Sequence, residues 1–189
     1  MKTRSNRAGR RVAPGVILLA CLLAGGRLDA LTLTDLLNDP KMNPKRFAAH
    51  FEDFEYEFGV EVLPPQVFLA RRRGDCDDYA ILADYVLRRT DRETRLIHVR
   101  MVGRVAHAVC HVTPDGVYLD FNHRKLFFNL KRCGRTIREI ATKVAESFQA
   151  NWTSASEFTF DYNEDKKHFG ATVVKTEPPA GDPDATIRK

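Results

Sequence analysis

The chain of 189 residues has few cysteines and no long hydrophobic run, and each shortage excludes a class of protein. Four cysteines are too few for the dense disulfide scaffold of small secreted domains. The longest apolar run, residues 12–24, has 13 positions and contains Pro14 and Gly15, whereas a helix that spans a membrane needs about 20 residues. We therefore expect one globular domain that buries its own core and does not cross a membrane.

An excess of charge is also missing outside the first 30 residues. The whole sequence has a formal net charge of +5, a value that on its own suggests a nucleic-acid partner. Residues 1–30 hold six basic residues and one acidic residue, so residues 31–189 contain 24 of each sign and have a net charge of zero. The basic excess belongs to this N-terminal segment, and we expect no nucleic-acid partner.

Residues 1–30 contain the three parts of a bacterial secretory signal peptide: a cationic start, an apolar run and small residues soon after it. This pattern predicts a periplasmic or secreted protein, with cleavage after Gly26 or Ala30. The shortness of the apolar run disfavours a retained membrane anchor. An alternative is lipidation of Cys21, because the stretch from Leu18 to Cys21 resembles a bacterial lipoprotein box.

Three cysteines remain if Cys21 leaves with the signal peptide. An odd number in an exported protein leaves at least one free thiol to explain. A bridge between Cys110 and Cys133 would leave Cys76 free, although the sequence alone does not establish that bridge.

The hydrophobic patterns predict a single α+β domain over residues 31–175, in which helices precede antiparallel strands. Four phenylalanines at positions 47, 51, 54 and 58 suit one face of a helix that ends at Pro64-Pro65. The Pro and Gly positions of residues 113–116 predict a hairpin turn. Residues 176–189, with three prolines and no apolar pattern, are expected to form a disordered tail. Further helices are predicted over residues 76–89 and 136–149, and strands over residues 95–101, 106–112, 117–121, 126–130 and 158–162.

Cys76 stands where a glycine-containing turn meets the first turn of a predicted helix. Backbone N–H groups and the helix dipole stabilise a thiolate there, and the thiolate is the nucleophilic form of cysteine. Because Asp75 and Asp77 oppose a thiolate between them, the activation has to come largely from a nearby imidazole.

His107 and His111 lie four residues apart in one predicted strand and therefore share a face. If Thr113 and Gly116 pair across the turn, Asp120 falls on the same face as His107, one pair out of register. Asp120 can then orient the imidazole of His107, which completes a nucleophile, base and carboxylate. Asn122 shares that face as a second orienting candidate.

Three short blocks resemble the Cys, His and Asp blocks of bacterial transglutaminase-like cysteine peptidases. They occur in the same order within about residues 62–122, a third of the chain. The resemblance implies a papain-like, transglutaminase-like core in which a nucleophile-bearing helix packs on an antiparallel sheet, with Cys76, His107 and Asp120 as the catalytic residues. The blocks read Gly74-Asp75-Cys76-Asp77-Asp78-Tyr79-Ala80-Ile81, then His107-Ala108-Val109, then Leu119-Asp120-Phe121-Asn122.

The resemblance also implies a second use for the acidic residues beside the cysteine. In some periplasmic members of the family the corresponding residues bind calcium, which here gives Asp75 and Asp77 as candidate ligands. Calcium takes six to eight oxygens and the remaining ligands are not identifiable, so capping of the helix is the favoured role of both residues. We expect no cofactor to be required. A zinc site built from Cys110, His111, His123 and Cys133 is disfavoured because their spacing matches no known ligand pattern.

These observations predict an exported thiol hydrolase that cleaves a peptide or amide bond of a protein or peptide in the cell envelope, and that acts as a monomer. Two alternatives remain open. One is a transamidase, which passes the same acyl group to an amine instead of water. The other is a non-catalytic envelope binding protein on the same fold, which loss of a triad residue would have indicated.

Overall fold

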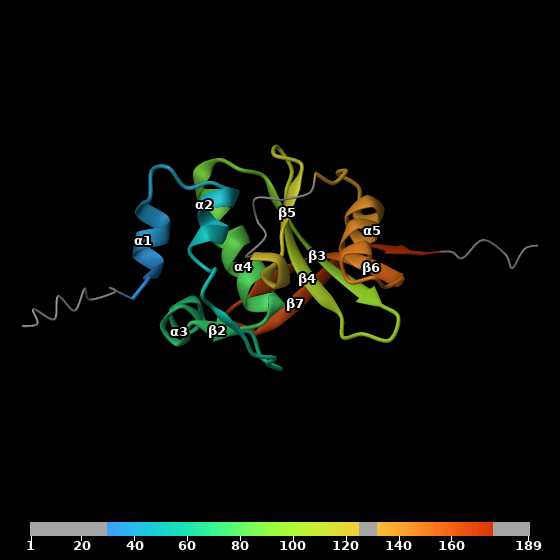
Figure 1. The fold of residues 1–189 in the computed structure, drawn as a ribbon, viewed down its shortest axis with the longest axis horizontal. Helices are drawn as coiled ribbons and strands as arrows, with labels where there is room; N and C mark the ends of the chain where they lie inside the picture. Colours follow the sequence, from blue (N-terminus) through green and yellow to red (C-terminus); the bar gives the residue numbers. More distant parts are fainter. Residues whose placement is uncertain (1–29, 125–131, 176–189) are drawn as a thin grey trace, which may run out of the picture.

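A five-stranded antiparallel sheet lies at the centre of the computed structural model, which describes residues 30–124 and 132–175 (Figure 1). The strand order is β5-β4-β3-β6-β7, and every neighbouring pair is antiparallel. Mixed helices and antiparallel strands confirm the predicted α+β class. The strands are β3 Thr94–Met101, β4 His107–Val112, β5 Val117–Leu119, β6 Trp152–Asp161 and β7 Lys166–Val174.

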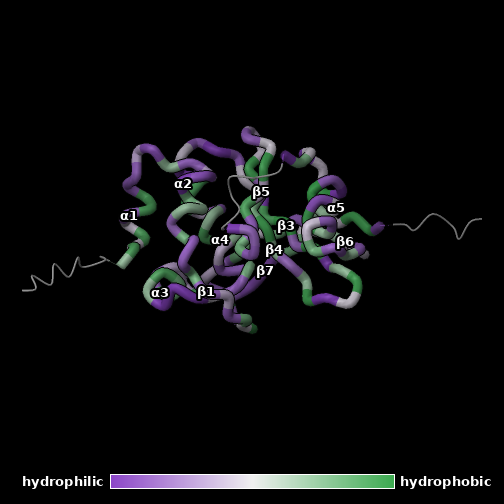
Figure 2. The backbone as a smooth tube through the Cα atoms, viewed as in Figure 1, coloured by the Kyte–Doolittle hydropathy of each residue, from purple (hydrophilic) through white to green (hydrophobic). Residues whose placement is uncertain are grey.

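Two helices cover opposite faces of this sheet, α4 (Cys76–Leu87) on one side and α5 (Ile137–Ser147) on the other (Figure 1). Successive side chains of a strand point to opposite faces, and β4 follows this rule. Its Ala108 and Cys110 belong to the buried cluster on the α4 side, whereas Val109 belongs to the cluster on the α5 side. The sheet is thus buried on both faces at β4, and the hydropathy colouring is apolar along its central strands (Figure 2).

The chain that precedes α4 forms short elements packed around the start of that helix. A two-stranded parallel sheet joins β1 to β2 there, through the pairs Glu55–Arg73 and Tyr56–Gly74. A single 3-10 turn follows α4. These elements are α1 Leu33–Asn38, α2 Pro44–Ala49, β1 Glu55–Tyr56, α3 Pro65–Arg71, β2 Arg73–Gly74 and η1 Arg88–Thr90.

The hairpin register predicted from the turn at residues 113–116 is confirmed. Val112 pairs with Val117 and Cys110 with Leu119, which is the register that follows when Thr113 faces Gly116. Gly116 has a φ of +59°, a conformation that glycine adopts without steric penalty, and its N–H donates to the carbonyl of Val112 at 3.0 Å. The turn therefore fixes which residues of β4 and β5 share a face.

The phenylalanine series does not form one helical face. Helix α2 ends at Ala49, and the chain continues through turns in which the N–H of Phe51 bonds to Ala48 and that of Phe54 bonds to Phe51. Phe47, Phe51 and Phe54 are buried in one aromatic cluster with Tyr79, whereas Phe58 is 61% exposed. Repeated turns with hydrogen bonds between residues three apart bring the rings of Phe47, Phe51 and Phe54 together, so the predicted single helix is wrong.

One other local expectation also needs correction. The Pro64-Pro65 pair starts α3 and does not merely end the preceding segment. Pro65 is the first residue of that helix, a position whose backbone N–H would have no acceptor within the helix, so proline is tolerated there. The basic run at residues 71–73 begins at the end of this helix, and its side chains are about half exposed. Its three arginines form ion pairs with acidic residues of the preceding segment, which are Asp53, Glu55 and Glu57.

The bridge considered between Cys110 and Cys133 is absent. All three cysteines within the described ranges are free and buried. Cys110 packs in the cluster on the α4 side of the sheet and Cys133 in the cluster on the α5 side. The sheet lies between these clusters, so the bridge would require a rearrangement of the core.

No helix within residues 30–124 and 132–175 is long and apolar enough to cross a membrane. The signal peptide predicted over residues 1–30 lies almost entirely outside the described residues. The strand predicted at residues 126–130 and the tail predicted from residue 176 lie outside them as well.

Replacement of Phe51 by Ala should lower the free energy of unfolding by about 3–5 kcal/mol, because it leaves a cavity among the buried rings. Phe58→Ala is the matched control, and its exposed ring should change that free energy by less than about 0.5 kcal/mol. Urea unfolding followed by tryptophan fluorescence, which reports on the single Trp152, measures both. Equal effects of the two substitutions would contradict the aromatic core described above.

Protein that lacks residues 1–30 should contain three free thiols. We expect a chromogenic thiol reagent to titrate three groups per chain in denaturant, both with and without prior reduction. A single titratable thiol before reduction would mean that Cys110 and Cys133 are bridged, contrary to their separation by the sheet.

Candidate active site

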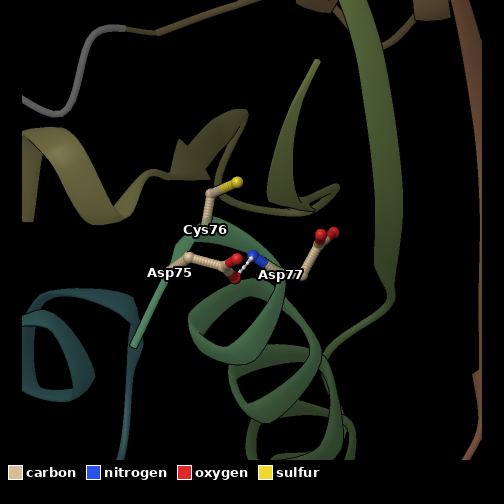
Figure 3. A group of neighbouring side chains, drawn as sticks. All are labelled: Asp75, Cys76 and Asp77. Carbon is tan, nitrogen blue, oxygen red and sulfur yellow. Dashed lines mark hydrogen bonds between the residues drawn. The ribbon is translucent and has the colours of Figure 1, made fainter. Parts of the chain in front are cut away.

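Cys76 is the first residue of α4, and a reciprocal cap fixes the turn that presents it. The Asp75 carboxylate accepts the N–H groups of Asp77 at 2.9 Å and Asp78 at 3.4 Å, while the Asp78 carboxylate accepts the N–H of Asp75 at 2.9 Å. Figure 3 shows the Cys76 sulfur projecting from the helix start, away from the two neighbouring carboxylates. A Cβ on Gly74 would lie 2.4 Å from the Asp78 carboxylate, so this position has no room for a side chain.

His107 opens β4, and Asp120 directly follows β5 on the neighbouring strand. The Nε2 of His107 lies 2.9 Å from Oδ1 of Asp120, and both side chains are buried. The Cys76 thiol lies close enough to His107 to help raise the pKa of that imidazole. Since Nε2 faces the carboxylate, Nδ1 is the ring nitrogen left for the thiol. The structure thus brings together the three residues that the sequence assigned to the site, from the start of α4, the start of β4 and the residue after β5.

The electrostatics of this group favour the charged form of the imidazole. Burial alone would lower the pKa of His107, but the charge of Asp120, its hydrogen bond and the contact with Cys76 outweigh burial and raise that pKa to about 10. Burial likewise opposes the charged form of Asp120. The charge of His107 and the hydrogen bonds from both neighbouring imidazoles outweigh it and lower the pKa of Asp120 well below its usual range.

Asp120 has two more partners, one of which the sequence did not identify. Its Oδ1 accepts the backbone N–H of Asn122 at 2.9 Å, and its Oδ2 lies 2.9 Å from Nδ1 of His123. Because a carboxylate only accepts, Nδ1 of His123 carries the proton. Asn122 therefore contacts Asp120 through its backbone, and His123 is the residue that holds the second oxygen.

Phe148, the C-cap of α5, closes the site on the side of the two histidines. Its ring centroid lies 4.7 Å from that of His107 and 5.8 Å from that of His123. On the other side Tyr56 lies near the nucleophile, and burial together with the charges of Cys76 and Asp75 raises the pKa of Tyr56 to about 12. Neither aromatic residue has a sequence pattern that links it to the cysteine.

His111 has no part in this arrangement. It is fully buried, and neither of its ring nitrogens has a hydrogen-bond partner in the part of the chain that the structure describes. Burial lowers the pKa of His111. The disfavoured zinc group of Cys110, His111, His123 and Cys133 is not assembled by the described residues.

The candidate calcium ligands Asp75 and Asp77 lie together with Cys76, with one ligand-type atom of each within 4.8 Å of the others. The oxygens of Asp75 accept backbone N–H groups, including that of Gly59 at 3.3 Å. Asp77 Oδ2 is ion-paired to Lys167 at 2.6 Å, and its buried Oδ1 has no hydrogen-bond partner among the described residues. Two carboxylates, one of them already bound by an ammonium, supply only part of the six to eight oxygens of a calcium site.

Among solved structures, calcium-bound LapG of Legionella pneumophila is similar to this chain, with 21% sequence identity and a TM-score of 0.41. That match spans 49% of this chain and 62% of the other, which is less than two thirds of its length. No curated protein sequence matches the chain.

The model of one protein family, described as a transglutaminase-like domain, matches residues 38–142. This range covers more than half of the sequence and contains Cys76, His107 and Asp120. The chain therefore belongs to the transglutaminase-like domain family.

Proposed function

We propose that the protein is a thiol hydrolase that cleaves a peptide or amide bond through an acyl group carried by Cys76. The single observation that carries the proposal is the position of His107. Its ring is buried between the thiol at the start of α4 and the carboxylate of Asp120, 2.9 Å from Nε2. A nucleophile, a base and a group that orients the base are the parts that acyl transfer requires.

The chemistry follows from the positions of these groups. The Cys76 thiolate attacks the substrate carbonyl, and the His107 imidazolium gives its proton to the leaving nitrogen as the C–N bond breaks. A water molecule then gives a proton to His107, and its oxygen attacks the thioester. The carboxylic acid product leaves, and the thiolate and imidazolium are restored.

The oxyanion that forms at the carbonyl has a natural donor at the start of α4. The first N–H groups of a helix have no acceptor within the helix, and they lie at the positive end of its dipole. The N–H of Cys76 itself is placed beside the carbon that its sulfur attacks, which is the arrangement of an oxyanion hole.

Asp120 and His123 act in this proposal through His107. Asp120 keeps Nε2 protonated and directs Nδ1 at the thiol. His123 is a positioning residue, because its Nδ1–H binds the free oxygen of the same carboxylate and limits rotation of that carboxylate about its side chain.

Two alternatives share parts of this site. A transamidase would form the same acyl group and pass it to an amine, and the described residues do not distinguish water from an amine as acceptor. A non-catalytic envelope binding protein is disfavoured because the nucleophile, the base and the carboxylate are all present in contact.

In this proposal the protein acts in the bacterial periplasm or the medium. Its substrate is a protein or peptide of the envelope, and its active form is a monomer. Support comes from the signal-peptide pattern of residues 1–30, and the neutral net charge of residues 31–189 argues against a nucleic-acid partner. Lipidation at Cys21 would keep the same domain at the membrane surface.

Iodoacetamide should alkylate Cys76 at pH 7 at least about tenfold faster than Cys110 or Cys133. Burial raises the pKa of Cys110 well above its usual value and that of Cys133 to about 11, so these two stay protonated. His107→Ala should slow alkylation of Cys76 about tenfold or more, and Asp120→Asn should slow it less. Cys76→Ser should abolish casein hydrolysis and the incorporation of a biotinylated amine. Peptide-level mass spectrometry gives the alkylation rate at each thiol.

The control is His168→Ala, which removes a half-exposed histidine paired with Glu164 at the surface and should leave all rates unchanged. His111 is unsuitable as a control because its removal would leave a cavity. Equal alkylation of the three thiols, with no effect of His107→Ala, would refute the catalytic assignment. A different result would select the transamidase. In that case amine incorporation would exceed casein hydrolysis in the wild type, and no variant would lose one activity without the other.

Replacement of His123 by Ala should slow alkylation of Cys76 at pH 7 by about tenfold, the effect expected from loss of one charge-assisted hydrogen bond worth about 1.5 kcal/mol. His123→Asn places an N–H donor near the former Nδ1 and should restore most of the rate. Thermal unfolding of both variants is the companion measurement. If both lower the melting temperature equally and Asn restores no rate, His123 has only a structural role.

A further inference from the structure

Lys167 forms a close ion pair beside the nucleophile. Its Nζ lies 2.6 Å from Oδ2 of Asp77, and the two side chains are only 23% and 20% exposed. Lys167 is the second residue of β7, so it comes from the far edge of the sheet, whereas Asp77 directly follows Cys76 in α4. The pair therefore joins two segments that are 90 residues apart in the sequence.

The ammonium of Lys167 occupies the position beside Asp77 at which a metal ion would have to bind. Asp77 is one of the three residues whose ligand-type atoms gather within 4.8 Å, together with Asp75 and Cys76. A divalent cation bound to the same carboxylate would lie within a few ångströms of Nζ. Two positive charges at that distance repel strongly in a partly buried site, so the ammonium and the metal exclude each other.

The surrounding strands hold Lys167 in place. It pairs with Phe160 across the β6–β7 ladder, and its Nζ also lies 5.8 Å from the ring centroid of Phe158 on β6. A cation over an aromatic ring gains electrostatic energy, and more so when it is partly removed from water. The other candidate ligand, Asp75, is occupied by the backbone N–H groups that build the helix start.

We infer that Lys167 is the resident cation of this site and takes the place of a divalent metal ion, so that the protein holds Asp77 neutralised without calcium. This inference goes beyond the proposed function, since it concerns the cation that accompanies the cysteine and not the reaction that the cysteine performs. It holds equally for a hydrolase, a transamidase or a binding protein.

The test compares the wild type with Lys167→Met, which keeps much of the side-chain length but removes the charge, and with Lys167→Arg, which keeps the charge. Lys166→Met is the matched control, because Lys166 is the neighbouring residue of β7 and is exposed. Melting temperatures are measured in 1 mM EGTA, 1 mM CaCl₂ and 1 mM MgCl₂, and calcium binding is measured by isothermal titration calorimetry.

The wild type, Lys166→Met and Lys167→Arg should melt at the same temperature with calcium as with EGTA and give no binding isotherm. Lys167→Met should melt several degrees lower in EGTA, because Asp77 is left without its partner. Calcium should raise that temperature again and bind this variant at least tenfold more tightly than the wild type.

Two outcomes would overturn the inference. The first is calcium binding by the wild type together with a rise in its melting temperature. This outcome is measured on the wild type alone, and it would mean that calcium displaces Lys167 from Asp77. The second is a folded Lys167→Met that does not bind calcium, which would mean that the ammonium does not stand in a cation site. Neither outcome touches the alkylation of Cys76, so the proposed function is tested separately.

Discussion

The carboxylate of Asp120 is the constraint on which the candidate site depends. Its side chain is only 2% exposed, and a buried charge is tolerated only where it is paired and hydrogen-bonded. His107 and His123 bind its two oxygens, so both rings lie beside the same carboxylate. The pairing of His107 with Asp120 stabilises the folded state between about pH 4 and 6.5. It weakens as the pH rises toward the raised pKa of His107, about 10, or falls toward the lowered pKa of Asp120.

The start of α4 shows why most residues of the cysteine block serve structure. Gly74 leaves space for the Asp78 carboxylate, which binds the N–H groups of Asp75 and of Leu63. Burial raises the pKa of Asp78 to about 6, and its backbone hydrogen bonds oppose that rise. The Asp78 carboxylate thus ties the chain before α3 to the first turn of α4. Only Cys76 directs its side chain to the place where chemistry would occur.

Local patterns predicted whatever depends on local geometry. Helix α4, strands β3 and β4, the hairpin register and the shared face of His107 and Asp120 follow from capping, alternation and turn chemistry. The patterns failed where packing between distant parts of the sequence determines the structure. Strand β7 is largely exposed at the sheet edge and lacks alternating apolar residues, so nothing in its sequence indicates a strand. His123 has no spacing that links it to Asp120, because the turn at residues 121–124 brings it there.

Asp75 and Asp77 show the same limit at the scale of two neighbouring residues. In the sequence they are equivalent carboxylates on either side of Cys76, and both disfavour a thiolate. The fold separates their roles, because Asp75 binds backbone N–H groups while Asp77 turns to an ammonium from β7. The charge beside the cysteine is therefore set by two residues from different strands, Lys167 of β7 and His107 of β4.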